Sequence, residues 1–207
     1  IFMKLETKNF YKTVGALVLP IALQNLINVA VTSADVVMLG RVGETVLSGS
    51  SLAGQVQFVL TLFLFGLTSG AAVLTAQYWG KKDMRTIEKV MGIAFRFSII
   101  VSVIFLLAVQ IFPAQVMSIF TPEQPVIDEG VKYLRIVSFT YLLCAVTQVY
   151  LNVMRSVERV VIATVTYSVS LIVNIIINGI LIFGLLGFPQ MGIVGAAIGT
   201  LVARIVE

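Results

Sequence analysis

The chain has 207 residues, of which 58% are hydrophobic and 12% are charged, and its formal net charge is +4. Soluble domains carry about 25% charged residues. With a mean hydropathy of +1.03, this composition excludes an ordinary soluble domain, and the small positive charge does not indicate nucleic-acid binding. The apolar runs have the length of helices that cross a hydrocarbon core about 30 Å thick, whereas alternating ten-residue strands are missing from the sequence.

The rare residue types exclude several further classes of site. The chain contains no His and a single Cys, Cys144. Sites built on His, including Ser-His triads and His-ligated metals, are therefore excluded, and an intrachain disulfide is impossible. We expect no cleavable signal peptide, because the first apolar run is too long and leads directly into further membrane segments.

The order of apolar runs predicts an all-α membrane protein, a bundle of six transmembrane helices. A short amphipathic segment precedes the first span, and Pro20 lies near the start of that span. Proline removes a backbone hydrogen bond, so we predict a helix kink at Pro20. The predicted spans cover about residues 14–39, 51–78, 87–112, 131–154, 161–186 and 191–207.

The positions of the basic residues predict the orientation in the membrane. Most Lys and Arg residues lie in the N-terminal segment and in the connections 80–89 and 155–159, which share one side if six spans alternate. The positive-inside rule then places that side, with the N-terminus, in the cytoplasm. We expect a multi-pass protein of the cell membrane, with Asp35 toward the outer half of its span.

The first span carries a stripe of polar residues on one face. Gln24, Asn28, Thr32 and Asp35 follow one another at helical intervals of four, four and three residues. A carboxylate near the bilayer centre costs about 2.5–3.5 kcal/mol on insertion scales. We therefore predict that this stripe lines an internal cavity and that Asp35 acts in transport; the alternative is a packing role with Arg41 as its partner.

The fifth span repeats this arrangement. Tyr167, Ser170, Asn174 and Asn178 are spaced by three, four and four residues and share one helix face. Asn178 lies toward the outer end of its span, as Asp35 does. The two stripes together are expected to line one cavity and to bring a carboxylate close to two amides.

These groups suit the binding of a small cation. Amide and hydroxyl oxygens with one carboxylate form a site for a hard cation such as Na+, with Asp35 and Asn174 as ligands. Thr200 and Ala196 in the sixth span would add a hydroxyl and a backbone carbonyl. Alternatively, burial would favour the protonated carboxyl and make Asp35 a proton carrier. The two Asn residues have a simpler alternative role, as hydrogen bonds between helices.

Five segments occur in an order and spacing that resemble a known transporter family. They are ADVVMLGRVG at 34–43, LTAQYWG at 74–80, MRSV at 154–157, NIIINGILIFG at 174–184 and GIVGAA at 192–197. Each segment is weak alone, but together they resemble the multidrug and toxic compound extrusion (MATE) family over nearly the whole chain.

The resemblance implies the N-terminal six-helix lobe of a two-lobe, twelve-helix transporter. Its partners would be the lipid bilayer, a second six-helix lobe of the same polypeptide and a small cationic or amphiphilic substrate. Such proteins are antiporters that export drugs in exchange for H+ or Na+ and need no cofactor. Since the sequence stops within its last span, we expect it to be a fragment of a longer protein.

Individual positions also match the family pattern. Asp35 matches the acid of helix one, and Asn174 matches an amide of helix five. Thr200 matches a hydroxyl of helix six, and Tyr133 matches a tyrosine of helix four. The resemblance therefore implies that these residues belong to the cation or proton site.

Two other positions complete the comparison. Pro20 matches a helix-one proline that is associated with bending. Asn178 departs from the pattern, because family members with this site carry a second Asp there. One carboxylate in place of two leaves the site with one fewer negative charge, which lowers its expected affinity for cations and leaves the coupling ion open.

Three other functions were weighed against export. A lipid-linked precursor flippase of the same superfamily would need several Arg or Lys residues facing the cavity, whereas most basic residues here lie at span ends. An intramembrane enzyme is disfavoured by the lack of His and of paired Asp residues within spans. A homodimer of six-span units is disfavoured by the chain's end in mid-pattern.

Overall fold

The structure, a computed structural model, describes residues 2–157 and 159–207. The side chains of residues 2–13, 16, 17, 20, 21, 24, 28 and 160 lie outside this description. The elements are α1 (Phe2–Val42), α2 (Glu44–Gly80), α3 (Met84–Ile111), α4 (Pro113–Ser118), α5 (Gln124–Val137), α6 (Thr140–Ser156), α7 (Val160–Phe183), the 3-10 turn η1 (Leu185–Gly187) and α8 (Gly192–Val206).

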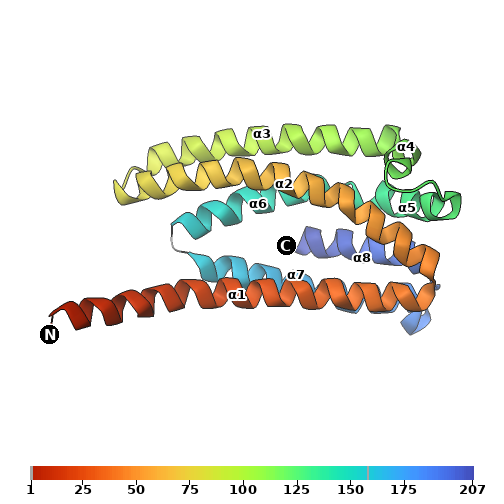
Figure 1. Ribbon diagram of the computed structural model, residues 1–207, viewed down its shortest axis with the longest axis horizontal. Helices are drawn as coiled ribbons and strands as arrows, with labels where there is room; N and C mark the ends of the chain where they lie inside the picture. The colour runs from red at the N-terminus through yellow and green to blue at the C-terminus, as the bar shows by residue number, and fades with distance from the viewer. Residues whose placement is uncertain (1, 158) are drawn as a thin grey trace.

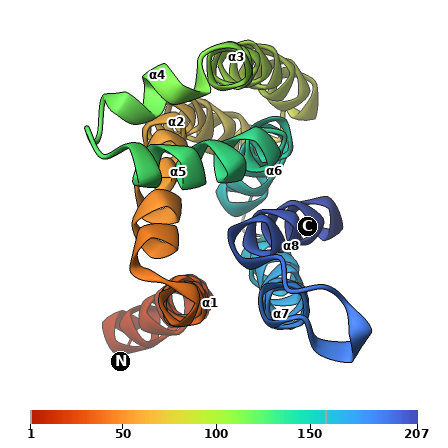
Figure 2. The same cartoon turned by 90° about the vertical axis from the view of Figure 1, so that its right-hand side faces the viewer.

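The long helices run side by side along the long axis of the molecule (Figure 1). Viewed along that axis, α1 and α7 lie next to each other, α8 packs on α7, and α3 forms the far edge (Figure 2). The contacts agree with this picture: α7 packs on α8 and α1, while α2 packs on α3, α5 and α6. An all-helical bundle satisfies every backbone group within its own segment, as a membrane requires.

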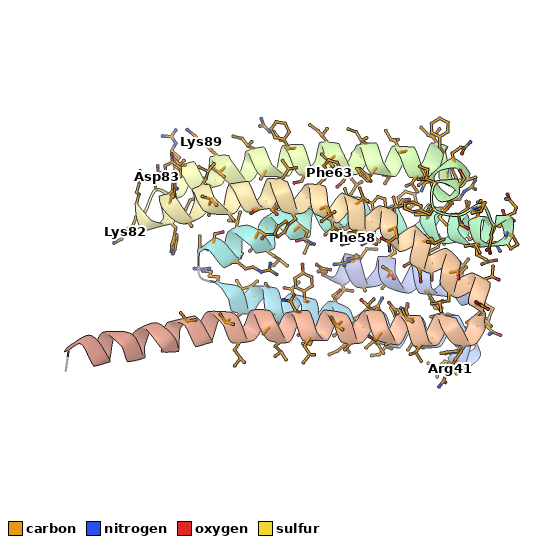
Figure 3. All side chains as sticks on the ribbon, in the orientation of Figure 1. Arg41, Phe58, Phe63, Lys82, Asp83 and Lys89 are labelled. Carbon is orange, nitrogen blue, oxygen red and sulfur yellow. The ribbon has the colours of Figure 1, made fainter. Side chains whose placement is uncertain are left out.

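Polar connections separate the two ends of the bundle. Figure 3 shows Lys82, Asp83 and Lys89 at one end and Arg41 at the opposite end. Asp83 caps α3: its carboxylate accepts hydrogen bonds from the backbone N–H and the hydroxyl of Thr86, at 3.1 and 2.6 Å. These hydrogen bonds lower the pKa of Asp83 below its usual value. The α6–α7 connection and the start of α1 lie toward the end that Lys82 marks (Figure 1).

Several helices are long and apolar enough to cross a membrane. Within the described residues there are four such segments: 25–42 of α1, α2, α3 and residues 161–183 of α7. Together, α5 and α6 are also long and apolar enough to cross a membrane, as one broken span with a bend of 54°. The last helix, α8, is a shorter apolar helix of 15 residues.

The observed helix ends differ from the predicted spans in two places. The predicted connection 40–50 is almost entirely helical, and only Gly43 separates α1 from α2. α2 begins at Glu44, and the positive end of the helix dipole stabilises the negative charge of this residue. The predicted loop 113–130 holds α4 and the first half of α5, because Pro113 and Pro125 occupy first-turn positions that tolerate proline.

The predicted fourth span, 131–154, is not one straight helix. The structure divides it between α5 and α6, which meet at Ser138 and Phe139 with the 54° bend. The Ser138 hydroxyl accepts a hydrogen bond of 2.8 Å from the Gln110 side chain, and the same side chain donates to the Arg135 carbonyl. The bend is thus tied to α3 by hydrogen bonds that no helical periodicity could predict.

A small-residue face of α2 also differs from expectation. The spacing of Gly66, Ser69, Gly70 and Val73 predicts close helix contact. In the described structure all four residues are exposed, and a Cβ at either glycine would meet no atom within 4 Å. This face of α2 therefore packs on no described helix.

The main apolar core lies between α2, α5 and α6. Leu60 and Leu64 of α2 pack with Leu134 of α5 and Tyr141 of α6, and all four are at most 1% exposed. Met117 of α4 closes the core at one end. Because lipid is as apolar as these side chains, their stabilising effect comes from close packing rather than from removal of water.

Replacing Leu60 by Ala should therefore destabilise the bundle. The cavity left behind loses dispersion contacts worth on the order of 2 kcal/mol. Leu107→Ala is the matched control, since Leu107 on α3 is 48% exposed. Thermal unfolding of the full-length transporter in detergent should show a lower midpoint for Leu60→Ala and little change for Leu107→Ala; equal shifts would contradict this description of the core.

Candidate functional site

A polar cavity of about 670 Å³ lies inside the bundle. Its wall is formed by residues of α1, α2, α5, α6, α7 and α8. Among the described lining residues, Asp35 and Arg204 are the two charged ones. Drug-sized ligands occupy pockets of about 300–1,000 Å³, so the cavity is large enough for such a molecule.

The carboxylate of Asp35 joins α1 to α7. Its Oδ1 accepts a hydrogen bond of 2.7 Å from Nδ2 of Asn178, while the side chain also lines the cavity. Asp35 is half-buried. The alternative partner, Arg41, is exposed at the end of α1 and forms no ion pair with Asp35 within the described structure.

Asn178 has a second hydrogen bond on its own helix. The same Nδ2 donates to Oδ1 of Asn174, one turn earlier in α7, at 3.2 Å. An amide nitrogen carries two hydrogens, so both bonds form together. Asn178 is fully buried behind the cavity wall, whereas Asn174 reaches the wall. The carboxylate therefore faces an amide nitrogen, and the cavity borders this pair on the side of Asp35 and Asn174.

Two glycines of α8 make room for this amide. An ideal Cβ at Gly199 would lie 1.8 Å from Oδ1 of Asn178, and one at Gly195 would lie 2.7 Å from the backbone of Leu181. Oδ1 of Asn178 is buried without a conventional hydrogen-bond partner. The lack of a Cβ at Gly199 is therefore what leaves room for this oxygen.

The GAAIG segment at 195–199 is thus the signal that indicates this close α7–α8 packing, through the small-xxx-small pattern of membrane helices. The family resemblance covers residues 192–197 of this region and so does not extend to Gly199. The pattern predicts close helix approach, but the residue opposite each glycine can be known only from the fold.

Tyr133 and Thr200 lie on the cavity wall near Asp35. The Tyr133 hydroxyl faces the Thr200 side chain and the Asp35 carboxylate. The Thr200 hydroxyl donates to the Ala196 carbonyl at 2.9 Å, so its proton is engaged within α8 and its oxygen can still accept. These two residues add one phenol and one hydroxyl oxygen to the surroundings of the carboxylate.

The remaining members of the two polar stripes are placed as follows. Thr32, Tyr167 and Ser170 line the same cavity. The Ser170 hydroxyl donates to the Ala203 carbonyl at 2.9 Å and links α7 to α8. The side chains of Gln24 and Asn28, and that of Pro20, lie outside the described residues.

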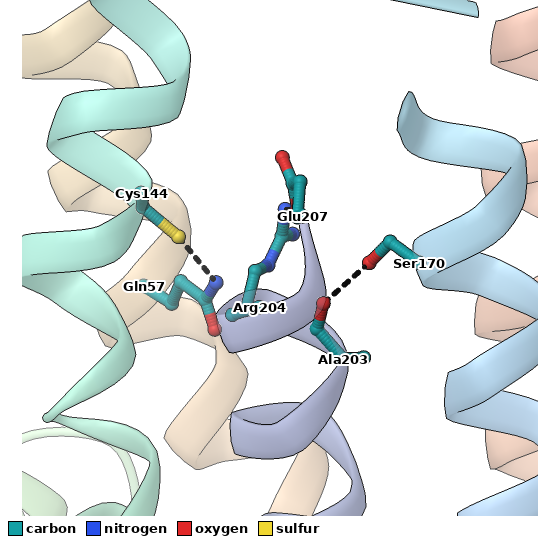
Figure 4. A network of polar contacts seen from close by, with 6 residues as sticks. All are labelled: Gln57, Cys144, Ser170, Ala203, Arg204 and Glu207. Atoms are coloured by element: carbon teal, nitrogen blue, oxygen red, sulfur yellow. Dashed lines mark hydrogen bonds and ion pairs between the residues drawn. The ribbon is translucent and has the colours of Figure 1, made fainter. Parts of the chain in front are cut away.

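Arg204 is the cavity residue whose position the sequence did not indicate. An Arg within a span is usually expected to be structural or to extend toward the membrane surface, but Arg204 lines the cavity and donates from Nη1 to Glu207. Figure 4 shows this pair between α6 and α7, with Gln57 and Cys144 on one side. Arg204 follows Thr200 by one helical turn, so the i, i+4 spacing already placed both on one face.

The chemistry of the site is that of a lone carboxylate among neutral polar groups. Within the described residues no three His, Cys, Asp or Glu side chains come together as metal ligands. The groups around Asp35 are the Asn178 amide nitrogen, the Asn174 amide, a hydroxyl and a phenol, and all of these except Asn178 line the cavity. Such a site can hold a proton or one weakly bound monovalent cation.

An apolar outer surface and a central polar cavity with one acidic group define the lobe of a multi-pass membrane transporter. The MatE family model matches residues 20–180. The chain therefore belongs to the MatE family, the multidrug and toxic compound extrusion proteins, and it forms one lobe of the two-lobe fold.

Individual relatives agree with this assignment. The chain is 24% identical over 203 residues to the probable multidrug resistance protein YoeA of Bacillus subtilis, covering 98% of this chain and 44% of that protein. It is 26% identical over 204 residues to the probable multidrug resistance protein NorM of Thermotoga maritima, with the same two coverages. The chain thus spans less than half the length of these relatives.

Solved structures show the same fold. The MATE multidrug transporter DinF-BH, in complex with rhodamine 6G, superposes with a TM-score of 0.86 at 20% identity. The superposition covers 94% of this chain and 43% of that one. Proteins of this family are membrane transporters rather than enzymes.

The contact between Gly199 and Asn178 predicts a specific stability effect. Gly199→Ala should lower the thermal midpoint of the full-length transporter, because the added methyl group displaces the Asn178 amide. In an Asn178→Ala background the same substitution should cost much less, with a coupling energy of about 0.5–3 kcal/mol. Gly92→Ala, where a Cβ meets nothing within 4 Å, is the control. An equal cost in both backgrounds would show that Gly199 serves helix packing alone.

Proposed function

We propose that this chain is the N-terminal lobe of an ion-coupled antiporter that exports cationic or amphiphilic compounds. The observation that carries the proposal is the Asp35 carboxylate, which lines the 670 Å³ cavity and is held by the Asn178 amide. A carboxylate in a membrane span is costly, and its access to the cavity allows its charge to change during transport.

The relatives support the substrate class. Two of them are named probable multidrug resistance proteins, and one solved neighbour is a multidrug transporter with a bound dye. The full transporter would consist of this lobe and a second six-helix lobe of the same polypeptide. We infer that the end with Lys82 and Lys89 is cytoplasmic, as the positive-inside rule predicts, and that the protein lies in the cell membrane.

We propose H+ as the coupling ion, with Na+ as the alternative. Asp35 is the single acidic residue on the described cavity wall, and its Oδ1 faces an N–H donor rather than another oxygen. An N–H group repels a metal cation, whereas the other carboxylate oxygen can still accept a proton. The membrane potential supplies about 2.3 kcal/mol per charge per 100 mV, which allows one inward ion to drive uphill export.

Protonation of Asp35 and binding of a cationic substrate would exclude each other. An ionised carboxylate attracts a cationic substrate into the cavity, and a protonated one does not. Export follows if Asp35 takes up its proton while the cavity faces outward, which releases the substrate there. The proton is then given up while the cavity faces inward, where the ionised carboxylate binds the next substrate. The flows of proton and substrate are coupled because the conformation of the cavity depends on the charge of Asp35.

The flippase alternative receives less support. A cavity for a lipid-linked anionic precursor should present several basic side chains, and Arg204 is the one basic residue on the described wall. Drug export therefore remains the function that we propose.

Asp35→Asn should abolish export of rhodamine 6G from vesicles that contain the full-length transporter. The substitution keeps the side-chain shape but removes the group that binds the ion. Asp128→Asn is the matched control, because Asp128 is exposed on α5 and bonded to Gln124. Efflux is measured as dye fluorescence, with membrane expression checked by detection of a tag; normal efflux by Asp35→Asn would refute the role of this carboxylate.

The coupling ion is tested with separate gradients. A pH gradient alone should drive efflux in the natural protein, and a Na+ gradient alone should not. Asn178→Asp places a second carboxylate beside Asp35, which should raise cation affinity and allow a Na+ gradient to drive efflux. Efflux by the natural protein that follows Na+ and ignores pH would reject the proton assignment.

A further inference from the structure

We propose that Arg204 binds an anionic group of the substrate, so that the cavity selects zwitterionic amphiphiles over simple cations. The cationic part of the substrate would lie toward Asp35 and its acidic part toward Arg204. This inference rests on the function proposed above and adds a second charged subsite to the same cavity.

Arg204 is placed to meet a solute. It projects from α8 into the cavity, and its side chain remains 30% exposed. Its one hydrogen bond within the described structure runs from Nη1 to Glu207. A guanidinium has five N–H donors in a planar fork that matches a carboxylate. Donors therefore remain for an anionic group that approaches from the cavity.

Glu207 explains why a cation is tolerated at this depth. Its side chain is fully buried, whereas that of Arg204 is partly open to the cavity. The acid neutralises the guanidinium from behind, and a solute in the cavity meets only the positive partner. The pair therefore permits cationic substrates to enter while leaving a binding surface for an acidic group.

The neighbours of Arg204 are neutral and polar. Cys144 and Tyr167 lie close enough to act on the guanidinium, and both line the cavity together with Gln57 and Gln148. The Gln57 amide donates only to the Cys144 sulfur, at 3.9 Å, which is a weak contact (Figure 4). Thus an incoming carboxylate would gain an amide donor beside the guanidinium without displacing a strong bond.

The two charged lining residues come from different walls of the cavity. Asp35 lies on α1 and is bonded to α7. Arg204 lies on α8, and residues of α2 and α6 line the cavity with it. The described wall thus presents one negative and one positive group to a solute, with Glu207 behind the positive one. A molecule that carries both charges satisfies both groups, whereas a monocation satisfies Asp35 alone.

Two dyes that differ in one group test the inference. Rhodamine 6G is an ethyl ester with a single positive charge, and its free acid, rhodamine 19, carries a carboxylate as well. Equilibrium binding of each dye to the full-length transporter in detergent, near neutral pH, is measured by fluorescence polarisation. We expect the acid to bind more tightly than the ester.

Variants then assign the preference to Arg204. Arg204→Gln should lower the acid-to-ester affinity ratio by about ten-fold, as expected for loss of a charge-assisted hydrogen bond. Arg204→Lys should retain most of the ratio. Arg96→Gln, at an exposed position on α3, is the control and should leave the ratio unchanged.

Glu207→Gln keeps Arg204 and frees its guanidinium, so it should raise the ratio; it tests the inference even if Arg204→Gln does not fold. An equal affinity for both dyes, or a ratio that is the same in all variants, would show that the ion pair is structural and overturn the inference. If the ester binds and is exported by a pH gradient while the acid-to-ester affinity ratio is the same in all variants, the inference fails and the proposed function stands. If neither dye binds, the inference is overturned, and the gradient experiments with other cations judge the function separately.

Discussion

The hydrogen bond between Asp35 and Asn178 is the interaction on which the rest of the site depends. A carboxylate inside the membrane needs a partner, and the nearest one available here is an amide on another helix, 2.7 Å away. That bond joins α1 to α7. A second bond, to Asn174, fixes the amide on α7 itself. The charge of Asp35 is therefore tied to the relative position of two long helices.

The small residues of α8 allow this arrangement. Gly195 and Gly199 bring α8 against α7 so closely that a methyl group at either position would collide with its neighbour. The same approach aligns Thr200 and Arg204 along the cavity wall. One face of α8 thus packs the helices together, and the adjacent face presents polar groups to the cavity. A substitution in the packing face would therefore change the surroundings of the Asp35 carboxylate.

Much of this organisation could be predicted from the sequence. The composition and the long apolar runs specify a membrane helical bundle, and the family resemblance is shown by the match over residues 20–180. The two polar stripes have helical spacing, so their residues had to share one face of each helix. Thr32 and Asp35 of the first stripe and Tyr167, Ser170 and Asn174 of the second do line one cavity.

Other features depend on contacts between distant segments. The bend between α5 and α6 involves a hydrogen bond from Gln110 on α3, and no local pattern near Ser138 indicates it. The donor for Asp35 is the amide nitrogen of Asn178, and this choice follows from the neighbouring helix. The place of Arg204 on the cavity wall also depends on packing, which decides which side of α8 faces the cavity. In the sequence, an Arg in a span resembles one that extends to the membrane surface.

The central claim, that water reaches Asp35 through the cavity, can be measured by cysteine reactivity. In a Cys144→Ser background, Asp35→Cys should react with a membrane-impermeant, cationic thiosulfonate reagent, and excess substrate should slow the reaction. Val37→Cys, on the same helix but outside the described cavity wall, should react slowly or not at all. A thiol at position 35 that stays unreactive from both sides of the membrane, or that reacts no faster than one at position 37, would contradict the account.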